Sequence, residues 1–263
     1  MRASVLNIVI SCPDGEWTGD RWVGPPQDLA RFYAELLGMR IVRQDWLIVA
    51  RDARATPRLA FDGEPSGYEP PRWPDPDHPQ QLHLDIAVAD LPAAEATIAR
   101  LGARQLQDRG AFRTYADPAG HPFCLFPSPS AVGVSGGRIE RIVFDCPDPG
   151  VLAAFYAELL DLRTIRLDPP DRVTISRAEG QGSSATGDEP ALAFQRVRDH
   201  RPPRWPDPAY PQQIHLDIDV DDGDAACDLA EHLGATRLQE MGGSCPVYAD
   251  PAGHPFCLCA PDQ

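Results

Sequence analysis

Apolar residues recur with the period of a helix in some stretches of the chain and with the period of a strand in others. Residues 28–37 place their large apolar side chains on one helical face and end at Gly38, and residues 91–101 form a second helical stretch that ends at Gly102. The remaining apolar stretches are short and bounded by turn residues, as is typical of strands. We expect these strands at residues 5–11, 40–43, 46–51, 57–61, 81–88, 104–107, 112–116 and 122–126. The pattern predicts two consecutive β-α-β-β-β modules in the first half of the chain.

Long blocks of sequence recur in the second half in the same order. The block YADPAGHPFCL at residues 115–125 recurs unchanged at 248–258, and PQQLHLDI at 79–86 recurs at 211–218 with one Leu-to-Ile change. Each copy is far longer than a solenoid repeat, so each copy should be a domain with its own core. The predicted division is a first domain over residues 1–128, a linker over 129–137 and a second domain over 138–263.

The order of elements and these repeated blocks resemble the glyoxalase-like branch of the vicinal oxygen chelate superfamily. The resemblance covers nearly all of both halves. It implies an α+β fold of two tandem domains, each a pair of βαβββ modules that form a cup-shaped sheet. In such a fold the helices lie outside and a small-molecule site lies inside the cup.

The strand that carries the HLD motif has one apolar face and one polar face. Its four aliphatic residues alternate with His83 and Asp85, and the second copy places His215 and Asp217 in the same way. We expect the aliphatic face to pack on the helices and the polar face to line the cup. Each His–Asp pair is then either an acid–base pair or a structural hydrogen bond, and the spacing is equally compatible with both.

The metal ligands that the superfamily resemblance implies are mostly missing. His83 and His215 match the fifth-strand histidine of metal-dependent members. The first-strand ligand position falls on Asn7 and Arg141, and the eighth-strand glutamate falls on Cys124 and Cys257. A divalent ion needs at least three good ligands, and each half keeps one. We expect no metal, no cofactor, and neither classical metal-dependent glyoxalase nor extradiol dioxygenase activity.

The first half is expected to hold the working pocket. Only this half carries an insertion, residues 15–24, whose Trp17 and Trp22 predict either an aromatic flap over a ligand or an interface contact. Arg141 and Asp145 share a strand face in the second half and are expected to fill its cup with an ion pair. That half also has a Gly/Ser-rich loop at residues 179–187. The predicted ligand-binding residues of the first half are Asn7, Ser11, Trp17, Trp22 and Cys124, beside His83 and Asp85 as catalytic candidates. Their second-half equivalents are Arg141, His215, Asp217 and Cys257.

Composition narrows the possible partners. The chain has 39 acidic and 24 basic residues, a net charge of −15, and every basic residue is Arg. Such a surface repels nucleic acids and anionic membranes, so neither is an expected partner. No apolar run approaches the ~20 residues of a membrane span, and a cytoplasmic location is expected. The seven cysteines lack CxxC spacing and are predicted to be reduced thiols, with Cys245 and Cys259 counted as packing residues.

The sequence leaves two hypotheses for function, because function depends on the site rather than on the fold. The first is a protein, monomeric or homodimeric, that binds a small metabolite or antibiotic-like ligand without the usual metal and sequesters or processes it. The alternative is a lyase, isomerase or hydrolase that uses His83 and Asp85 as acid and base. The thiols of Cys124 and Cys257 are expected to be inert, because nothing near them in sequence stabilises a thiolate.

Overall fold

The computed structural model describes residues 1–64, 68–131, 136–168, 171–177, 189–207, 210–239 and 245–260. The Gly/Ser-rich loop at 179–187 and residues 132–135 of the expected linker lie outside these ranges. No helix in the part of the chain described here is long and apolar enough to cross a membrane.

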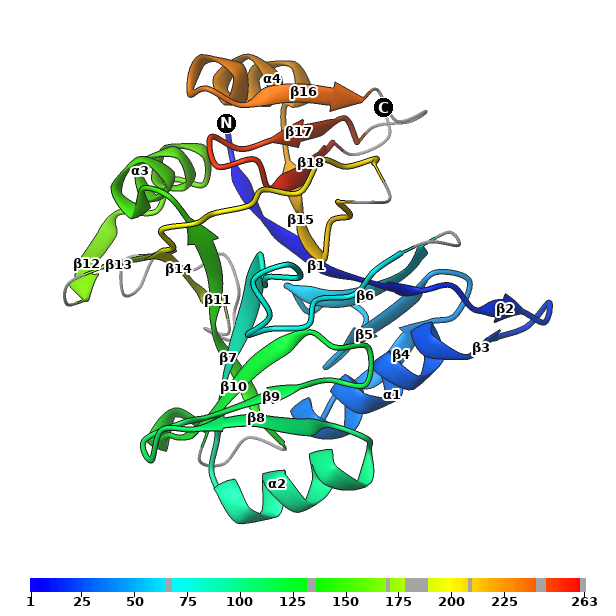
Figure 1. Cartoon of the computed structure of the whole chain (residues 1–263). Helices are drawn as coiled ribbons and strands as arrows, with labels where there is room; N and C mark the ends of the chain where they lie inside the picture. The colour runs from blue at the N-terminus through cyan, green and yellow to red at the C-terminus, as the bar shows by residue number, and fades with distance from the viewer. Residues whose placement is uncertain are drawn as a thin grey trace.

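Four βαβββ modules follow one another along the chain (Figure 1). The first contains β1 (Ala3–Pro13), α1 (Pro25–Leu37), β4 (Arg40–Arg43), β5 (Leu47–Ala50) and β6 (Arg58–Glu64). The second contains β7 (Leu82–Val88), α2 (Leu91–Arg100), β8 (Arg104–Asp108), β9 (Arg113–Ala116) and β10 (Pro122–Pro127). The third contains β11 (Arg138–Cys146), α3 (Pro149–Leu159), β12 (Thr164–Asp168), β13 (Arg172–Ser176) and β14 (Ala191–Arg196). The fourth contains β15 (Ile214–Val220), α4 (Gly223–His232), β16 (Thr236–Gln239), β17 (Val247–Ala249) and β18 (Pro255–Cys259).

Local signals set the helix boundaries. The Asp148 side chain caps α3 by accepting hydrogen bonds from the backbone N–H groups of Gly150 and Val151, and Pro149 occupies the first turn. Gly38 ends α1 in the left-handed conformation, with φ of 61°, which a residue with a Cβ adopts only with strain. The helices therefore begin and end close to where the sequence pattern places them.

Each of the two large sheets combines one module from each half. The first sheet has the order β16-β17-β18-β15-β1-β6-β5-β4, and the second sheet has the order β12-β13-β14-β11-β7-β10-β9-β8. The joints are antiparallel: β1 pairs with β15, and β7 pairs with β11. The α+β class, the tandem duplication and the four modules are confirmed. The structure differs from the expectation in one respect, because the two modules of one half contribute to different sheets.

The two halves meet through a symmetric pair of glutamines from the repeated PQQ motif. The backbone N–H of Gln81 donates to Oε1 of Gln213 at 2.9 Å, and the N–H of Gln213 donates to Oε1 of Gln81 at 3.0 Å. The two side-chain amides donate to the carbonyl oxygens of Pro211 and Pro79. All four bonds cross between the halves, so they fix the start of β7 relative to the start of β15.

One continuous core lies between the sheets and the helices. The aliphatic residues of β7 and β15 are buried in it, as the alternation of those strands predicts. Tyr33 on α1 donates a hydrogen bond to Asp117 in the β9–β10 turn, and Asp117 also contacts His121. Tyr156 repeats this bond with Asp250 in the second half. Much of the repeated YADPAGHP block therefore connects helices to hairpins rather than lining the cup.

The expectation that all cysteines are reduced is wrong for one pair. Cys245 and Cys259 form a disulfide. The β17–β18 hairpin brings their Cα atoms within 4.3 Å, a proximity that their sequence separation of 14 does not reveal. The free cysteines are Cys12, Cys124, Cys146, Cys227 and Cys257.

Candidate functional site

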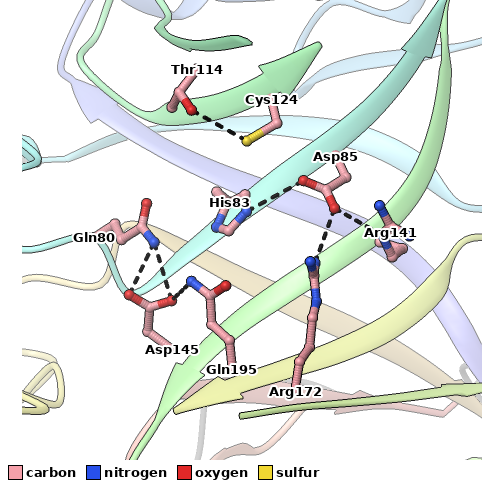
Figure 2. A network of polar contacts seen from close by, with 9 residues as sticks. All are labelled: Gln80, His83, Asp85, Thr114, Cys124, Arg141, Asp145, Arg172 and Gln195. Atoms are coloured by element: carbon pink, nitrogen blue, oxygen red, sulfur yellow. Dashed lines mark hydrogen bonds and ion pairs between the residues drawn. The ribbon is translucent and has the colours of Figure 1, made fainter. Parts of the chain in front are cut away.

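A cavity of about 590 Å³ opens on the polar face of the second sheet. His83 and Asp85 from β7 line it together with Cys124 from β10, and the second half contributes Arg141 from β11 and Arg172 from β13. Figure 2 shows these side chains converging from strands of both halves. We call this space the His83 cavity.

His83, Asp85 and Cys124 form the centre of the cavity wall. The period of two along β7 puts both polar residues on one face, and the parallel register of β10 sets Cys124 opposite Asp85. Nε2 of His83 lies 3.4 Å from Oδ1 of Asp85. One ligand-type atom from each of the three residues lies within 4.8 Å of the other two. The Thr114 hydroxyl is 3.6 Å from the Cys124 sulfur.

Two arginines of the second half bind the Asp85 carboxylate. Nε of Arg141 donates to Oδ2 at 2.8 Å, and Nη2 of Arg172 donates to the same oxygen at 3.0 Å. The Arg141 guanidinium also lies 5.5 Å from the ring centroid of Phe126, within the range of a cation–π contact. Each guanidinium has five N–H donors, so these bonds leave most of its donor capacity unused by Asp85.

This arrangement shifts the pKa values of the central pair in opposite directions. Burial alone raises the pKa of Asp85, but the hydrogen bond to His83 and the charges of Arg172 and Arg141 outweigh it and hold the pKa well below its usual range. Burial alone lowers the pKa of His83, but its contacts with Asp85 and Cys124 outweigh it and raise the pKa to about 10. At neutral pH the pair is therefore an imidazolium beside a carboxylate. Nδ1 of His83 is buried and has no hydrogen-bond partner among the described residues.

The expected ion pair between Arg141 and Asp145 is not formed. Asp145 instead accepts hydrogen bonds from the amides of Gln80 and Gln195, the latter at 2.6 Å. Burial raises the pKa of Asp145, and the nearby charge of His83 and the two amides oppose that rise. Arg141 bonds to Asp85 because β11 lies beside β7 in the second sheet. Arg141 therefore belongs to the His83 cavity and does not fill a separate cup.

The first sheet carries a related group of side chains. His215, Asp217 and Cys257 are arranged like His83, Asp85 and Cys124, and we call them the His215 cluster. Asn7 donates a hydrogen bond to Oδ2 of Asp217 at 2.8 Å, and Arg58 donates to Asn7. Burial lowers the pKa of His215, but contact with Asp217 and Cys257 outweighs it and raises the pKa well above its usual value. Among the described residues, Asp217 accepts a hydrogen bond from the Asn7 amide, whereas Asp85 accepts hydrogen bonds from the guanidinium groups of Arg141 and Arg172.

The predicted grouping of Asn7 and Ser11 with His83 is wrong. Asn7 belongs to the His215 cluster, because β1 pairs with β15 and not with β7. Ser11 donates a hydrogen bond to Glu64 at 2.7 Å, also in the first sheet. The repeat places equivalent residues correctly within each half, but the sheet is completed by the other half.

The tryptophans of the insertion do not line the His83 cavity. They form a short hairpin of β2 (Glu16–Trp17) and β3 (Trp22–Val23) beside α1 (Figure 1). The two indole rings lie 5.7 Å apart, and Trp22 donates to the carbonyl oxygen of Asp45. Trp17 is 40% exposed at the tip of this hairpin. The expected position of Trp17 and Trp22 at the mouth of the His83 pocket is therefore wrong.

Several residues of the cavity were not predicted from the sequence. Trp73, Phe112 and Phe126 supply aromatic wall, and Gln80 and Arg172 supply polar contacts. The repeated Arg-Trp-Pro and Pro-Gln-Gln blocks were available signals for Trp73 and Gln80. No local signal marked Arg172, because only the pairing of β7 with β11 across the halves places β13 in the same sheet as Asp85.

A divalent metal does not fit the His83 cavity well. Arg141 stands at the position where the superfamily resemblance implies a first-strand metal ligand, and Arg141 and Arg172 already place two positive charges on Asp85. A divalent ion bound to the same carboxylate would lie against both guanidinium groups. Both triads place an imidazole, a carboxylate and a thiol close enough to hold an ion such as Zn²⁺. The His215 cluster has no guanidinium bonded to its carboxylate in the described part of the chain, so it suits a cation better.

Comparisons with known proteins agree with this architecture. A family model described as a glyoxalase-like domain matches residues 19–126 and again residues 141–259. Glyoxalase I from Zea mays has a similar structure, with a TM-score of 0.62 and 13% identity over 97% of this chain and 92% of that chain. A putative dioxygenase from Bacillus subtilis subsp. subtilis str. 168 has a TM-score of 0.60 and 13% identity over 99% of this chain and 86% of that chain. At this identity the structural likeness shows the fold alone. No curated protein matches the sequence.

Proposed function

We propose that this chain, which belongs to the glyoxalase-like domain family, binds a small organic anion in the His83 cavity without a metal. The observation that carries the proposal is the charge of the cavity wall. Three arginines and the His83 imidazolium face the cavity, and Asp85 is the one carboxylate among the described lining residues. This excess of positive charge lies in a chain whose net charge is −15.

The arginines suit a carboxylate or a similar planar anion. A guanidinium group presents paired N–H donors that match the two oxygens of a carboxylate. Arg141 and Arg172 are held in place by Asp85, so their orientation does not depend on the ligand. Preorganised donors lose little conformational entropy when the ligand binds.

The remaining wall suits an apolar ligand body. Trp73, Phe112 and Phe126 line the same cavity, and aromatic rings provide large contact areas for flat ligands. The volume of about 590 Å³ lies within the range of small-molecule sites, roughly 300–1,000 Å³. A small anion with an aromatic or unsaturated body therefore satisfies both parts of the wall.

Catalysis by His83 and Asp85 is the second candidate function. Their separation of 3.4 Å, beside a thiol, supports it. The pKa of about 10 for His83 weighs against a role as general base near neutral pH, because the imidazole is already protonated there. The imidazolium is better suited to hold negative charge on a ligand or on a reaction intermediate.

Calorimetric titration with benzoate and its neutral analogue benzamide tests the proposal. We expect benzoate to bind at least about tenfold more tightly, since a charge-assisted hydrogen bond contributes about 1.5–3 kcal/mol. Arg172→Gln should remove most of this preference, and His83→Ala should weaken benzoate binding more than His215→Ala. Arg58→Gln, which alters the His215 cluster, is the matched control and should bind benzoate like the wild type. Equal affinities for benzoate and benzamide would refute the proposed anion site.

A further inference from the structure

We infer that Cys124 is a nucleophilic thiol that captures carboxylates carrying an electrophilic carbon. The inference rests on the proposed function, because Arg141 and Arg172 are the groups that would hold the carboxylate. It goes beyond that function by adding a covalent step and a class of reactive ligand.

The environment of Cys124 differs from that of the buried core thiols. Cys12 and Cys146 donate hydrogen bonds to the backbone carbonyl oxygens of Asp62 and Gln195 and belong to the apolar core. Burial raises the pKa of Cys146 to about 12, which keeps its thiol protonated at neutral pH. Cys124 is also buried, with 8% of its surface exposed, but unlike the core thiols it lines the His83 cavity.

The neighbours of Cys124 are those that activate thiols. Its sulfur belongs to a group in which atoms of His83, Asp85 and Cys124 lie within 4.8 Å of one another. A nucleophile, an imidazole and a carboxylate that orients the imidazole form the general arrangement of activated thiols. A second, independent observation is that His83 is only 7% exposed and its Nδ1 has no hydrogen-bond partner among the described residues. A buried polar atom of this kind usually has a partner, and we infer that a ligand in the cavity lined by His83 supplies it.

The chemical step balances without a further reactant. When the ligand carries a carbon–carbon double bond conjugated to its carboxylate, a sulfur–carbon bond forms at the β carbon and the π bond breaks. The thiol proton passes to the α carbon by way of water, and nothing is oxidised or reduced. When the ligand carries a leaving group, the bond to that group breaks, the group leaves as an anion and the proton goes to solvent.

The second half supplies a matched internal control. Cys257 lies beside His215 and Asp217 as Cys124 lies beside His83 and Asp85, but Asn7 replaces Arg141 there. The repeat also aligns Phe112 and Phe126 of the cavity wall with Cys245 and Cys259, which form the disulfide. Cys257 therefore keeps the imidazole and the carboxylate, but among the described residues no guanidinium is hydrogen-bonded to Asp217, and a disulfide stands where the cavity has Phe112 and Phe126.

Alkylation with iodoacetate and iodoacetamide, followed site by site with mass spectrometry, tests the inference. In both reagents the carbon–iodine bond breaks and iodide leaves, but only iodoacetate carries a carboxylate. With a chelator present, we expect iodoacetate to modify Cys124 at least about tenfold faster than Cys257. We also expect Cys124 to prefer iodoacetate over iodoacetamide, and benzoate to slow the reaction. Arg172→Gln should remove most of the preference, and Cys124→Ser should lose only the fast adduct.

The alkylation rates and the benzoate affinity together distinguish a reactive Cys124 from an anion site. If Cys124 reacts with iodoacetate no faster than Cys257 while benzoate still binds more tightly than benzamide, the anion site stands and the nucleophile is overturned. If both reagents modify Cys124 rapidly and equally, and benzoate gives no protection, the proposed anion site is overturned. In that second case the inference also fails for carboxylates, because the arginines do not select the ligand.

Discussion

Replacing Asp85 with Asn should destabilise the folded protein more than the equivalent replacement in the His215 cluster. The Asp85 side chain is 6% exposed, accepts hydrogen bonds from Arg141 and Arg172, and lies 3.4 Å from His83. The substitution keeps the shape of the side chain but removes the negative charge that these three groups share. Removing one partner of a buried ion pair costs about 3–5 kcal/mol. Because the two arginine side chains are 34% and 25% exposed, solvent screens part of the loss, and we expect about 3 kcal/mol.

Asp217→Asn is the matched control for Asp85→Asn. Asp217 is similarly buried, but it accepts one hydrogen bond from the neutral amide of Asn7 and lies 3.5 Å from His215. A hydrogen bond between neutral groups contributes about 1 kcal/mol, and partial loss of the imidazolium contact adds a comparable amount, so we expect about 1–2 kcal/mol. The difference between the two variants measures the contribution of the arginines.

Urea and thermal unfolding, followed through tryptophan fluorescence and circular dichroism, measure both effects. For a chain of this size, about 3 kcal/mol corresponds to a midpoint roughly 6–12 °C lower for Asp85→Asn. Benzoate at about 100 times its Kd should restore about 2.7 kcal/mol in Asp85→Asn, since the freed arginines still bind the anion. Arg172 and Arg141 would have no structural role at Asp85 if both Asn variants lost the same stability. Unfolding of Asp85→Asn at the wild-type midpoint would refute the assignment of a buried ion-pair network.

Two further predictions concern protons and metals. In the fold the pKa of His83 rises from its ordinary 6.5 to about 10, so its stabilising contribution is complete below pH 6.5 and is lost as the pH rises through about 10. The unfolding midpoint of the wild type should therefore exceed that of His83→Gln at pH 6 and converge with it above pH 10, and a constant difference would contradict the pairing with Asp85. Elemental analysis should find no stoichiometric Zn²⁺, Fe²⁺, Ni²⁺ or Mn²⁺ bound to His83, and added Zn²⁺ should protect Cys257 rather than Cys124 from alkylation. Equimolar metal that protects Cys124 would show that the arginines do not exclude a cation.

The sequence by itself determined the features that depend on neighbouring residues. The period of two along residues 82–88 places His83 and Asp85 on one face of β7 and its aliphatic residues in the core. Asp148 and Gly38 mark helix ends through their own backbone and side-chain bonds. The repeated blocks identify the duplication directly. The strand period and the helix-end signals act within a few residues, and the duplication is visible by comparing the sequence with itself, so none of them requires knowledge of the fold.

Tertiary structure alone decided which modules share a sheet. β7 offers the same kind of edge to either copy of its partner strand, and the hydrophobic pattern of β1 and β11 is alike, so the local pattern is compatible with pairing inside a half or across halves. The observed pairing of β7 with β11 brings Arg141 and Arg172 to Asp85. The same exchange sends Asn7 to Asp217 in the other sheet. The charge of the cavity, and with it the ligand that we propose, therefore depends on contacts between residues more than 50 positions apart, which no periodicity in the sequence encodes.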